Sequence, residues 1–526
     1  MSEQSHRSTQ ITPFHLVVIG AGASGLACAI RMAQVLDAHD LRDAVRIEVY
    51  EASRKVGHSI LASGNGRCNY SNTKIYETAN TDVSTNPSTG SSTDPNTGSS
   101  TDPNTGSSTD PNIDPIATAE QFYTHADFVE KVRAACCEQC APAPEWLSTL
   151  GLLGREVKTH EGMLFPVSNQ AHNVLDTLLS WCEVYNIAIV PQTRVETLSR
   201  RPEGRFVISG IRSVPLDAGM MVRQGAKKKK AKKPQYQEVP FSRSADAIVL
   251  AVGRALYDTP QLALSHPLVP MHPVLGPLRA TLSDVPEAAH WDNALDGVRQ
   301  QVALRVVSRH SNRCVFTEVG EVLFRSYGIS GIVVFNASRF AQPGDRIELD
   351  LLPDLGSDAL MRHLMQTYQV WKAAECDVEQ ETLGNVIDAL LTGVFAEPLR
   401  NVIAVRVCTS MQVGSDVPLA AGLFSNKART LCECITQASK HVVFTVEGIA
   451  ADQVCQVMRG GCKVDLLDPE TCESCIVPQL YITGEALDVD GPCGGFNLDW
   501  AWTSGIVAGE ALARNVMQHH ARESLI

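Results

Sequence analysis

The hydrophobic pattern is most regular near the N-terminus, where an apolar run leads into glycines and then a helical repeat. Residues 16–19 read LVVI, residues 20–25 read GAGASG, and apolar side chains recur at Leu26, Ile30 and Ala33. A short continuous apolar run is typical of a buried strand, and apolar residues three or four apart are typical of a helix. The pattern predicts a strand, a tight turn and a helix, in that order.

Farther along the chain the period of the pattern changes twice. Helices are predicted over 120–139 and 171–184, and strands near 187–190, 205–208 and 245–252. From 300 to 352 apolar and polar residues alternate, as in Val302 and Leu304, which indicates antiparallel strands with one solvated face. Between 357 and 395 the helical spacing returns, with Leu360 and Leu364 one turn apart. A second β domain with a helical insertion is therefore predicted.

The C-terminal segment repeats the style of the N-terminal one. A strand over 480–482 is followed by a glycine-rich turn over 491–497 and a helix over 498–513. Within that helix, Gly505 and Gly509 lie one turn apart and predict close packing against a neighbouring element.

The glycine turn has the spacing of a dinucleotide-binding motif. Gly20 permits the tight turn, Gly22 allows close approach of a pyrophosphate, and Gly25 allows the helix to pack on the strand. A strand over 46–50 ends at Glu51, whose carboxylate can accept hydrogen bonds from ribose hydroxyls. An acid there favours FAD or NAD over NADP, and a second glycine turn before a C-terminal helix favours the longer ligand, FAD.

Composition changes this picture in a few places. The chain has 526 residues, 44% hydrophobic and 20% charged, with a net charge of −13, which argues against coating nucleic acid as a main role. No stretch is long and apolar enough for a membrane span and no signal peptide is evident, so we expect a cytoplasmic protein that does not bind membranes. An octapeptide repeat over 83–115 predicts a solvated insert, and a lysine-rich segment over 223–236 predicts a solvated loop.

Three longer motifs resemble those of the BaiN-like bacterial flavoproteins, also described as NAD(P)/FAD-dependent oxidoreductases or the aminoacetone oxidase family. They are SGNGRCN at 63–69, LF followed by YGISG within 323–331, and GEALDVDGPCGGFN at 484–497. The resemblance implies an α/β fold: a Rossmann-like FAD-binding domain of the glutathione-reductase type, an inserted antiparallel β-barrel, and a helical domain nested in the barrel. It also implies a non-covalent FAD that transfers hydride to or from a small organic substrate.

The domain boundaries and cofactor contacts follow from pattern and resemblance together. We expect the FAD-binding domain over 12–262 and 462–526, the barrel-like substrate domain over 263–355 and 428–461, and the helical domain over 356–427. The expected FAD contacts are Gly20, Ala21, Gly22, Ala23, Ser24, Gly25, Glu51, Gly64, Asn65, Gly66, Arg67, Cys68, Asn69, Val195, Ala251, Gly253, Gly484, Glu485, Gly494, Gly495, Phe496, Asn497 and Leu498.

None of the sixteen cysteines or the histidines can be assigned a catalytic role from the sequence. The CxxC pairs at 137–140 and 472–475 have redox spacing, but chance spacing is favoured, and nothing suggests a metal site. Cys68 and Cys493 lie in the flavin motifs, where a small packing residue is favoured over a redox partner. Histidines at 58, 160, 172 and 266 could donate protons, with His58 and His172 in the more suggestive positions.

The expected function is an FAD-dependent oxidoreductase with an unidentified substrate. There is no second GxGxxG turn, so NAD(P)H, where it is the donor, would dock transiently at the flavin. Two alternatives stay open. Residues 251–254 read AVGR where the resembling proteins usually carry Ala-Thr-Gly-Gly, which suggests flavin binding without turnover, and the lysines suggest an RNA-associated flavoprotein. The sequence leaves the oligomeric state undetermined.

Overall fold

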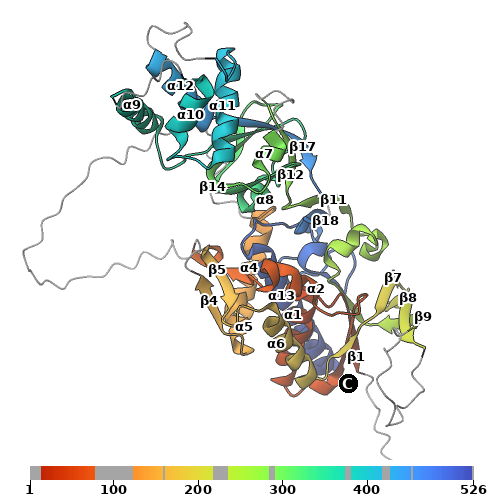
Figure 1. The fold of residues 1–526 in the computed structure, drawn as a ribbon. Coiled ribbons are helices and arrows are strands. Elements are labelled where there is room, and N and C mark those ends of the chain that lie inside the picture. The colour runs from red at the N-terminus through yellow and green to blue at the C-terminus, as the bar shows by residue number, and fades with distance from the viewer. Residues whose placement is uncertain are drawn as a thin grey trace, which may run out of the picture. The chain divides into compact units, whose positions relative to one another are not determined.

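The computed structural model describes residues 13–77, 123–157, 160–216, 235–283, 291–373, 381–417, 427–451 and 454–523 (Figure 1). The octapeptide repeat expected over 83–115 lies outside these residues, and so does the lysine-rich segment as far as residue 234. Described residues up to 272 and from 457 onwards form one compact unit, and those from 273 to 456 form a second. Each unit has its own hydrophobic core.

A parallel sheet forms the centre of the first unit. Its strand order is β19-β10-β1-β2-β6, with β1 (Phe14–Ile19), β2 (Val45–Tyr50), β6 (Ala188–Val190), β10 (Ala247–Leu250) and β19 (Leu480–Ile482). Leu16 on β1 is in register with Ala247 on one side and Ile47 on the other. Because helices cover both faces of such a sheet, β10 is buried along its whole length. The Rossmann-type α/β fold expected from the sequence is confirmed.

Two helices from opposite ends of the chain pack closely within this unit. They are α1 (Ala23–Asp37) and α13 (Phe496–Glu523). A Cβ atom on Gly505 would lie 2.4 Å from the Ser24 carbonyl oxygen, and one on Gly509 would lie 2.5 Å from that of Cys28. The close packing expected at these two glycines is confirmed, and it depends on their lack of a side chain.

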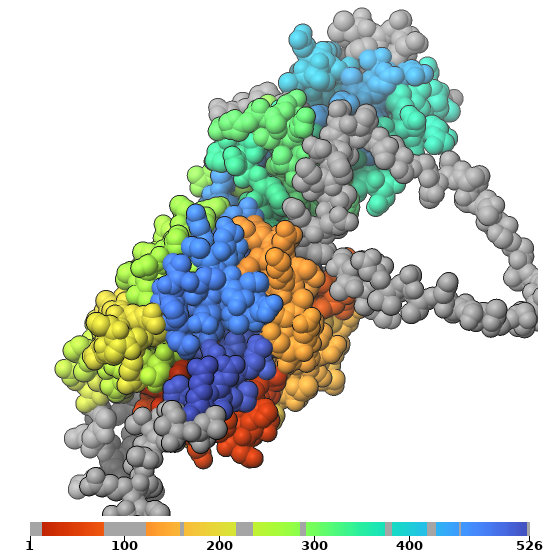
Figure 2. Space-filling view, turned by 180° about the vertical axis from the view of Figure 1, so that it is seen from behind, coloured from red at the N-terminus to blue at the C-terminus, as the bar shows by residue number. Residues whose placement is uncertain are grey.

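The other elements of the first unit lie between these ends of the chain. Its helices are α2 (His58–Ala62), α3 (Lys74–Glu77), α4 (Ala126–Gln139), α5 (Ala143–Thr149) and α6 (Ala171–Val184). One small antiparallel sheet comprises β3 (Ser71–Asn72), β5 (His160–Pro166) and β4 (Gly154–Val157), and another β7 (Thr193–Arg200), β8 (Phe206–Pro215) and β9 (Tyr236–Ala245). β11 (Leu268–Val274), whose last two residues are counted with the second unit, pairs with β18 (Val457–Cys462). In Figure 2, blue C-terminal residues adjoin the orange segment of α4, so distant parts of the sequence share one surface.

The second unit is built on a closed antiparallel barrel, as expected. Its strand order is β12-β15-β14-β13-β16-β17, with β12 (Leu278–Leu282), β13 (Arg299–Val307), β14 (Cys314–Arg325), β15 (Gly328–Ser330), β16 (Arg346–Asp350) and β17 (Val442–Ile449). Two short helices, α7 (Trp291–Leu295) and α8 (Ile332–Ala337), accompany the strands. Between β16 and β17 the chain forms α9 (Ser357–Ala373), α10 (Leu383–Leu391), α11 (Glu397–Met411) and α12 (Lys427–Lys440), which share the core of the barrel.

Some of the observed elements depart from the prediction. α4 begins at Ala126 and not at residue 120, because His125 adopts a left-handed conformation with φ of 52°. The strand expected over 245–252 is interrupted at Asp246, whose carboxylate accepts a hydrogen bond from the His15 N–H and pairs with Arg205. α11 and α12 were not predicted. No helix in the described ranges combines the length and apolarity that crossing a bilayer requires.

Candidate cofactor site

The glycine turn before α1 is closely packed at two of its glycines and has room for a side-chain atom at the third. A Cβ atom on Gly20 would lie 2.2 Å from the Ala251 carbonyl oxygen, and one on Gly25 would lie 2.0 Å from the Gly20 carbonyl oxygen. On Gly22 it would meet only the Ser59 hydroxyl, 3.5 Å away. The first turn of α1 has no acidic residue and no side-chain cap, so its amides and helix dipole favour an anion.

Glu51 lies directly beside this turn, at the end of β2. Its Oε2 atom accepts a hydrogen bond from the Ala21 N–H at 3.1 Å, and its Oε1 atom accepts one from the Ser53 N–H at 2.7 Å. The Glu51 carbonyl accepts a hydrogen bond from the Thr193 N–H at 2.8 Å, which brings the start of β7, and with it Val195, to the same edge of the sheet. Val195 is buried and lies at a β-bulge.

The loop over 63–69 is held in an uncommon conformation. Gly64, Asn65, Gly66 and Cys68 all have φ between 54° and 80°, although two of them carry side chains. The Cys68 N–H donates to the Ser63 carbonyl at 3.1 Å and closes the loop, while the Arg67 guanidinium lies 5.1 Å from the centre of the Phe165 ring. Positive φ is uncommon at residues with side chains, such as Asn65 and Cys68, and such positions cluster at binding sites.

The C-terminal glycine turn meets this loop. A Cβ atom on Gly495 would lie 2.3 Å from the Ser71 carbonyl oxygen and 2.8 Å from Oδ1 of Asn69. The Asn72 side-chain amide donates to the Gly494 carbonyl at 2.9 Å. The structure thus brings together two motifs that are more than 400 residues apart in the sequence, immediately before Phe496, Asn497 and Leu498 open α13.

Two buried oxygens at this site have no protein partner. Among the described residues, Oδ1 of Asn69 and Oγ1 of Thr483 are buried without a hydrogen bond. Buried polar atoms without partners are rare, and a ligand that donates hydrogen bonds would satisfy them. Together with the room at Gly22 and the uncapped N-terminus of α1, these atoms fit a bound FAD.

The segment after β19 joins the glycine turn to α13. A Cβ atom on Gly484 would lie 2.7 Å from the Ser24 hydroxyl of α1. The Gly484 N–H donates to the Ser504 hydroxyl at 3.0 Å, and its carbonyl accepts from the Trp500 indole at 3.1 Å. Gly484 is therefore fixed between the first turn of α1 and the second and third turns of α13.

Glu485 brings a titratable group to this position. Burial raises the pKa of Glu485 to about 7; the Arg254 guanidinium opposes the rise, and the Asp490 carboxylate adds to it. A Cβ atom on Gly253 would lie 3.5 Å from Oε2 of Glu485. The arginine that replaces a glycine in the AVGR segment thus acts electrostatically on this acid.

A second buried acid lies in the first turn of α13. Asp499 accepts hydrogen bonds from the hydroxyl groups of Ser71 and Tyr76, the latter at 2.9 Å and 3.0 Å. Burial raises the pKa of Asp499 to about 6, although these hydrogen bonds oppose the rise. Asp499 therefore ties β3 and α3 to the start of α13.

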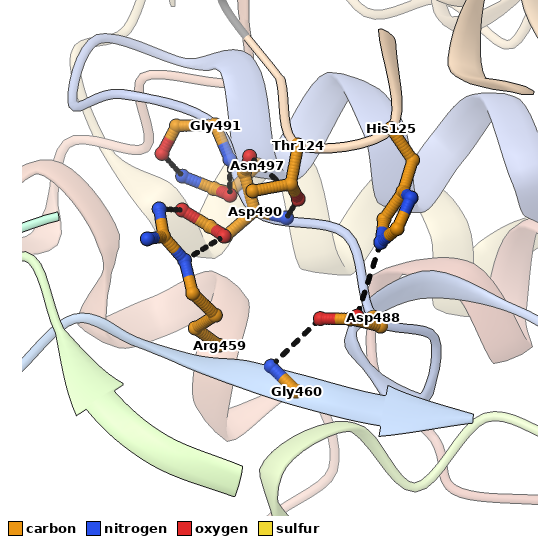
Figure 3. A network of polar contacts seen from close by, with 8 residues as sticks. All are labelled: Thr124, His125, Arg459, Gly460, Asp488, Asp490, Gly491 and Asn497. Carbon is orange, nitrogen blue, oxygen red and sulfur yellow. Dashed lines mark hydrogen bonds and ion pairs between the residues drawn. The ribbon is translucent and has the colours of Figure 1, made fainter. Parts of the chain in front are cut away.

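A polar network supports the C-terminal glycine turn (Figure 3). The Arg459 guanidinium donates to both carboxylate oxygens of Asp490, at 2.7 Å and 2.9 Å. The Asn497 side chain accepts from the Gly491 N–H at 2.8 Å and donates to the Gly491 carbonyl at 2.9 Å. The residues after 122 join the network through Thr124 and His125.

Of the cysteines singled out from the sequence, Cys68 and Cys472 are buried, whereas Cys137 and Cys475 are exposed. Burial raises the pKa of the Cys68 thiol to about 11, and it also raises the pKa of Cys137, Cys140 and Cys472. A thiol must ionise to attack or to carry redox chemistry, so these environments oppose such roles. Cys493 is half-buried.

The histidines singled out from the sequence differ in accessibility. His58 and His172 are exposed, at the starts of α2 and α6. His266 is 3% exposed, its Nε2 atom lies 2.8 Å from the Lys463 carbonyl oxygen, and burial lowers its pKa. The side chain of His160 lies outside the described part of the chain. Sequence reasoning missed Thr483, Arg459 and the Thr124–His125 segment, because no local motif marks them.

Known proteins resemble this chain over most of its length. A family model described as the HI0933-like protein Rossmann domain matches residues 143–511. A 3-dehydro-bile acid delta(4,6)-reductase of Clostridium scindens is 26% identical over 502 residues, covering 94% of this chain and 98% of that protein. A ribosomal RNA dihydrouridine synthase of Haemophilus influenzae is 23% identical, covering 95% of this chain and 98% of that protein. The enzyme of the same name from Escherichia coli is also 23% identical, covering 93% of this chain and 96% of that protein. Because the family model matches more than half of the chain, the protein belongs to the HI0933-like Rossmann family and is an FAD-dependent oxidoreductase.

Proposed function

We propose that this oxidoreductase reduces a carbon–carbon double bond conjugated with a carbonyl group in a small organic molecule, with NAD(P)H as the electron donor. The observation that carries the proposal is that the substrates named for its relatives contain the same reducible group. A 3-oxo-Δ4,6 steroid and a uracil ring both present a C=C bond conjugated with C=O. Reduced flavin supplies a hydride for such a bond when it is bound.

Different residues of the site would contact different parts of FAD. The turn from Gly20 to Gly25 would hold the pyrophosphate, Glu51 the adenosine ribose, and the backbone at Val195 the adenine. The flavin would lie along Asn65 to Asn69, where Oδ1 of Asn69 can accept a hydrogen bond. Gly484, Glu485, Ala251 and Gly253 would border the ribityl chain, and Gly494 to Leu498 would present the N-terminus of α13 to the pyrimidine edge.

A spectroscopic experiment tests this proposal. The protein is purified, its visible spectrum is recorded, and NADH or NADPH is added anaerobically, followed by androsta-4,6-diene-3,17-dione. We expect flavin absorbance that one nucleotide bleaches and the dienone restores, with a reduced steroid as product. A protein that takes up no FAD, or a bleached flavin that neither the dienone nor uridine in RNA reoxidises, would overturn it.

A second candidate substrate is uridine in RNA. It is favoured by the two relatives named ribosomal RNA dihydrouridine synthase and by Lys227–Lys230 with Lys232 and Lys233. Against it stands the net charge of −13. Formation of dihydrouridine in unmodified ribosomal RNA, with no turnover of the dienone, would favour this candidate. Salt-dependent RNA binding that persists after the lysines are replaced by glutamine would exclude them as its origin.

A further inference from the structure

His125 forms a pair with a buried carboxylate beside the C-terminal glycine turn. Its Nε2 atom lies 3.0 Å from Oδ2 of Asp488, and the other carboxylate oxygen of Asp488 accepts a hydrogen bond from the Gly460 N–H at 3.0 Å (Figure 3). The side chain of His125 is 41% exposed, whereas that of Asp488 is 11% exposed. One end of the pair is fixed, and the imidazole can reach a dissolved molecule.

The segment that carries His125 is fastened to the turn expected at the flavin. The Thr124 N–H donates to the Asp490 carbonyl at 2.9 Å, and the Asp490 N–H donates to the Thr124 hydroxyl at 2.9 Å. The Tyr123 hydroxyl donates to the Phe496 carbonyl at 2.8 Å. Asp488 to Phe496 is a continuous stretch, so the imidazole is held by the residues that lead into Gly494 and Gly495.

The neighbouring charges leave the Asp488 carboxylate to pair with His125. The carboxylate of Asp490, two residues away, is engaged through both oxygens by Arg459. Asp488 contacts a backbone amide and His125, and in the described part of the chain no other cation pairs with it. A carboxylate on one imidazole nitrogen fixes the orientation of the ring and stabilises its charged form, as in enzymes that use histidine as an acid or base.

The backbone of His125 is also unusual for a structural residue. It lies at the N-cap of α4 with φ of 52°, and its side chain makes no capping hydrogen bond. Asparagine or aspartate, which tolerate left-handed backbone and can cap a helix, would stabilise that position better. Strained backbone of this kind is more often found at functional sites than elsewhere.

We propose that His125 is the acid that protonates the substrate carbon in the reduction proposed above, and that Asp488 is its positioning residue. The inference rests on that proposed function. Reduction of the conjugated bond adds a hydride at the β-carbon, which the bound reduced flavin supplies, and a proton at the α-carbon. The C=C π bond is lost and two C–H bonds form. The imidazolium gives up its proton through Nδ1 and recovers one from solvent.

The test separates proton transfer from electron transfer. Holoenzyme is reduced anaerobically with dithionite, and the return of flavin absorbance is followed after mixing with either androsta-4,6-diene-3,17-dione or ferricyanide. Ferricyanide takes electrons without protonating carbon. For His125→Gln we expect reoxidation by the dienone to slow by about 10²–10⁴-fold, while reoxidation by ferricyanide stays unchanged. His39→Gln, on the exposed turn after α1, serves as the matched control.

Asp488 is tested by a measurement that needs no turnover. In ¹⁵N-histidine spectra, the signal lost in His125→Gln identifies His125, and we expect Asp488→Asn to change the chemical shifts of that imidazole and its tautomer. Free imidazole should restore part of the activity of His125→Ala. Equal dienone rates in wild type and His125→Gln, or a His125 signal unchanged in Asp488→Asn, would overturn the inference. If neither the dienone nor uridine in RNA reoxidises the wild-type flavin, the proposed function fails and the role of His125 with it.

Discussion

Gly20 and Gly22 are two residues apart and lack side chains for different reasons. Gly20 has φ of 109° and lies against the Ala251 carbonyl, so a side chain there would disturb the pairing of β1 with its parallel neighbour β10. Gly22 has φ of −86° and ψ of −166°, which any residue can adopt, and a Cβ atom there would meet only the Ser59 hydroxyl, at an ordinary contact distance. The first glycine serves the fold, whereas the second keeps a place for a ligand.

Substitution of these two glycines should therefore separate stability from cofactor binding. We expect Gly22→Ala to leave the Tm of the apoprotein nearly unchanged and to weaken FAD binding at least tenfold, or about 1.4 kcal/mol. Gly20→Ala should lower the Tm itself. Thermal unfolding and FAD titration by fluorescence quenching measure both effects. Normal FAD affinity in Gly22→Ala would show that the pyrophosphate does not lie there.

Glu485 should make the stability of the apoprotein depend on pH. Its pKa is about 7 in the folded protein and near 4.5 when exposed, so the folded state binds the proton more tightly. The stabilisation is complete below about pH 4.5 and is lost as the pH rises through 7. In urea unfolding we expect Glu485→Gln to match wild type at pH 5 and to be more stable at pH 8. An equal difference at the two pH values would contradict this assignment.

The functional residues that could be predicted are those whose role follows from the sequence immediately around them. Gly20, Gly22 and Glu51 belong to a strand–turn–helix–strand pattern that can be interpreted within forty residues. The unpaired Oδ1 of Asn69 and the contact of His125 with Asp488 depend on chain segments brought together only by folding. The latter pair is 363 residues apart in the sequence, and no periodic signal connects its members.

At the scale of elements, α1 and α13 pack against each other, and their N-terminal ends border the candidate site. Gly505 lies against the first turn of α1, at Ser24, and Gly509 lies one turn farther along, at Cys28. Both contacts are with backbone carbonyls, which cannot rotate away. An added methyl group must therefore push the two helices apart.

Alanine at these two glycines should have different effects on the cofactor. We expect Gly505→Ala and Gly509→Ala each to destabilise the protein by about 1–3 kcal/mol, the usual cost of overpacking. Only Gly505→Ala should also weaken FAD binding strongly, because Ser24 is in the first turn of α1. Urea unfolding and FAD titration of both variants make the comparison. Equal FAD affinities in the pair would show that the two helices shift as one body.

Helices and strands were predictable where their periodicity was undisturbed. The helix at 171–184 was predicted with its observed ends, since its apolar face is regular. The start of α4 was misplaced because the pattern gives no sign of the left-handed turn at His125. α11 was missed because Arg406, a charged residue, is buried in it and donates to the carbonyls of Ala438 and His441, which breaks the apolar stripe.

At the scale of the whole molecule, the two units are nested in sequence. The first is formed by both ends of the chain, and the second lies within a single interval between them. A prediction from length alone gives three domains in a row, and hydrophobic patterns show where the period changes without showing which segments rejoin. The resemblance of motifs at 63–69 and 484–497 supplied that information.

The octapeptide repeat should be dispensable for cofactor binding. Its residues are small, polar or turn-forming and have nothing to bury, so we expect deletion of Thr85 to Asn112 to leave the FAD content unchanged. The ratio of flavin to protein absorbance after purification gives the measurement. Loss of flavin in the deleted chain, with the remainder folded, would show that the repeat contributes to the site.

The contact of α1 with α13 has a consequence for synthesis of the protein. α1 precedes α13 by more than 450 residues in the chain, but twelve of its fifteen residues are buried in the finished unit, partly beneath that later helix. The intervening barrel and its helices have their own core and can fold while the ribosome is still at work. Until α13 emerges from the ribosome, the apolar residues of α1 that pack against it are exposed. A premature stop before residue 496 would leave them permanently accessible to chaperones and proteases.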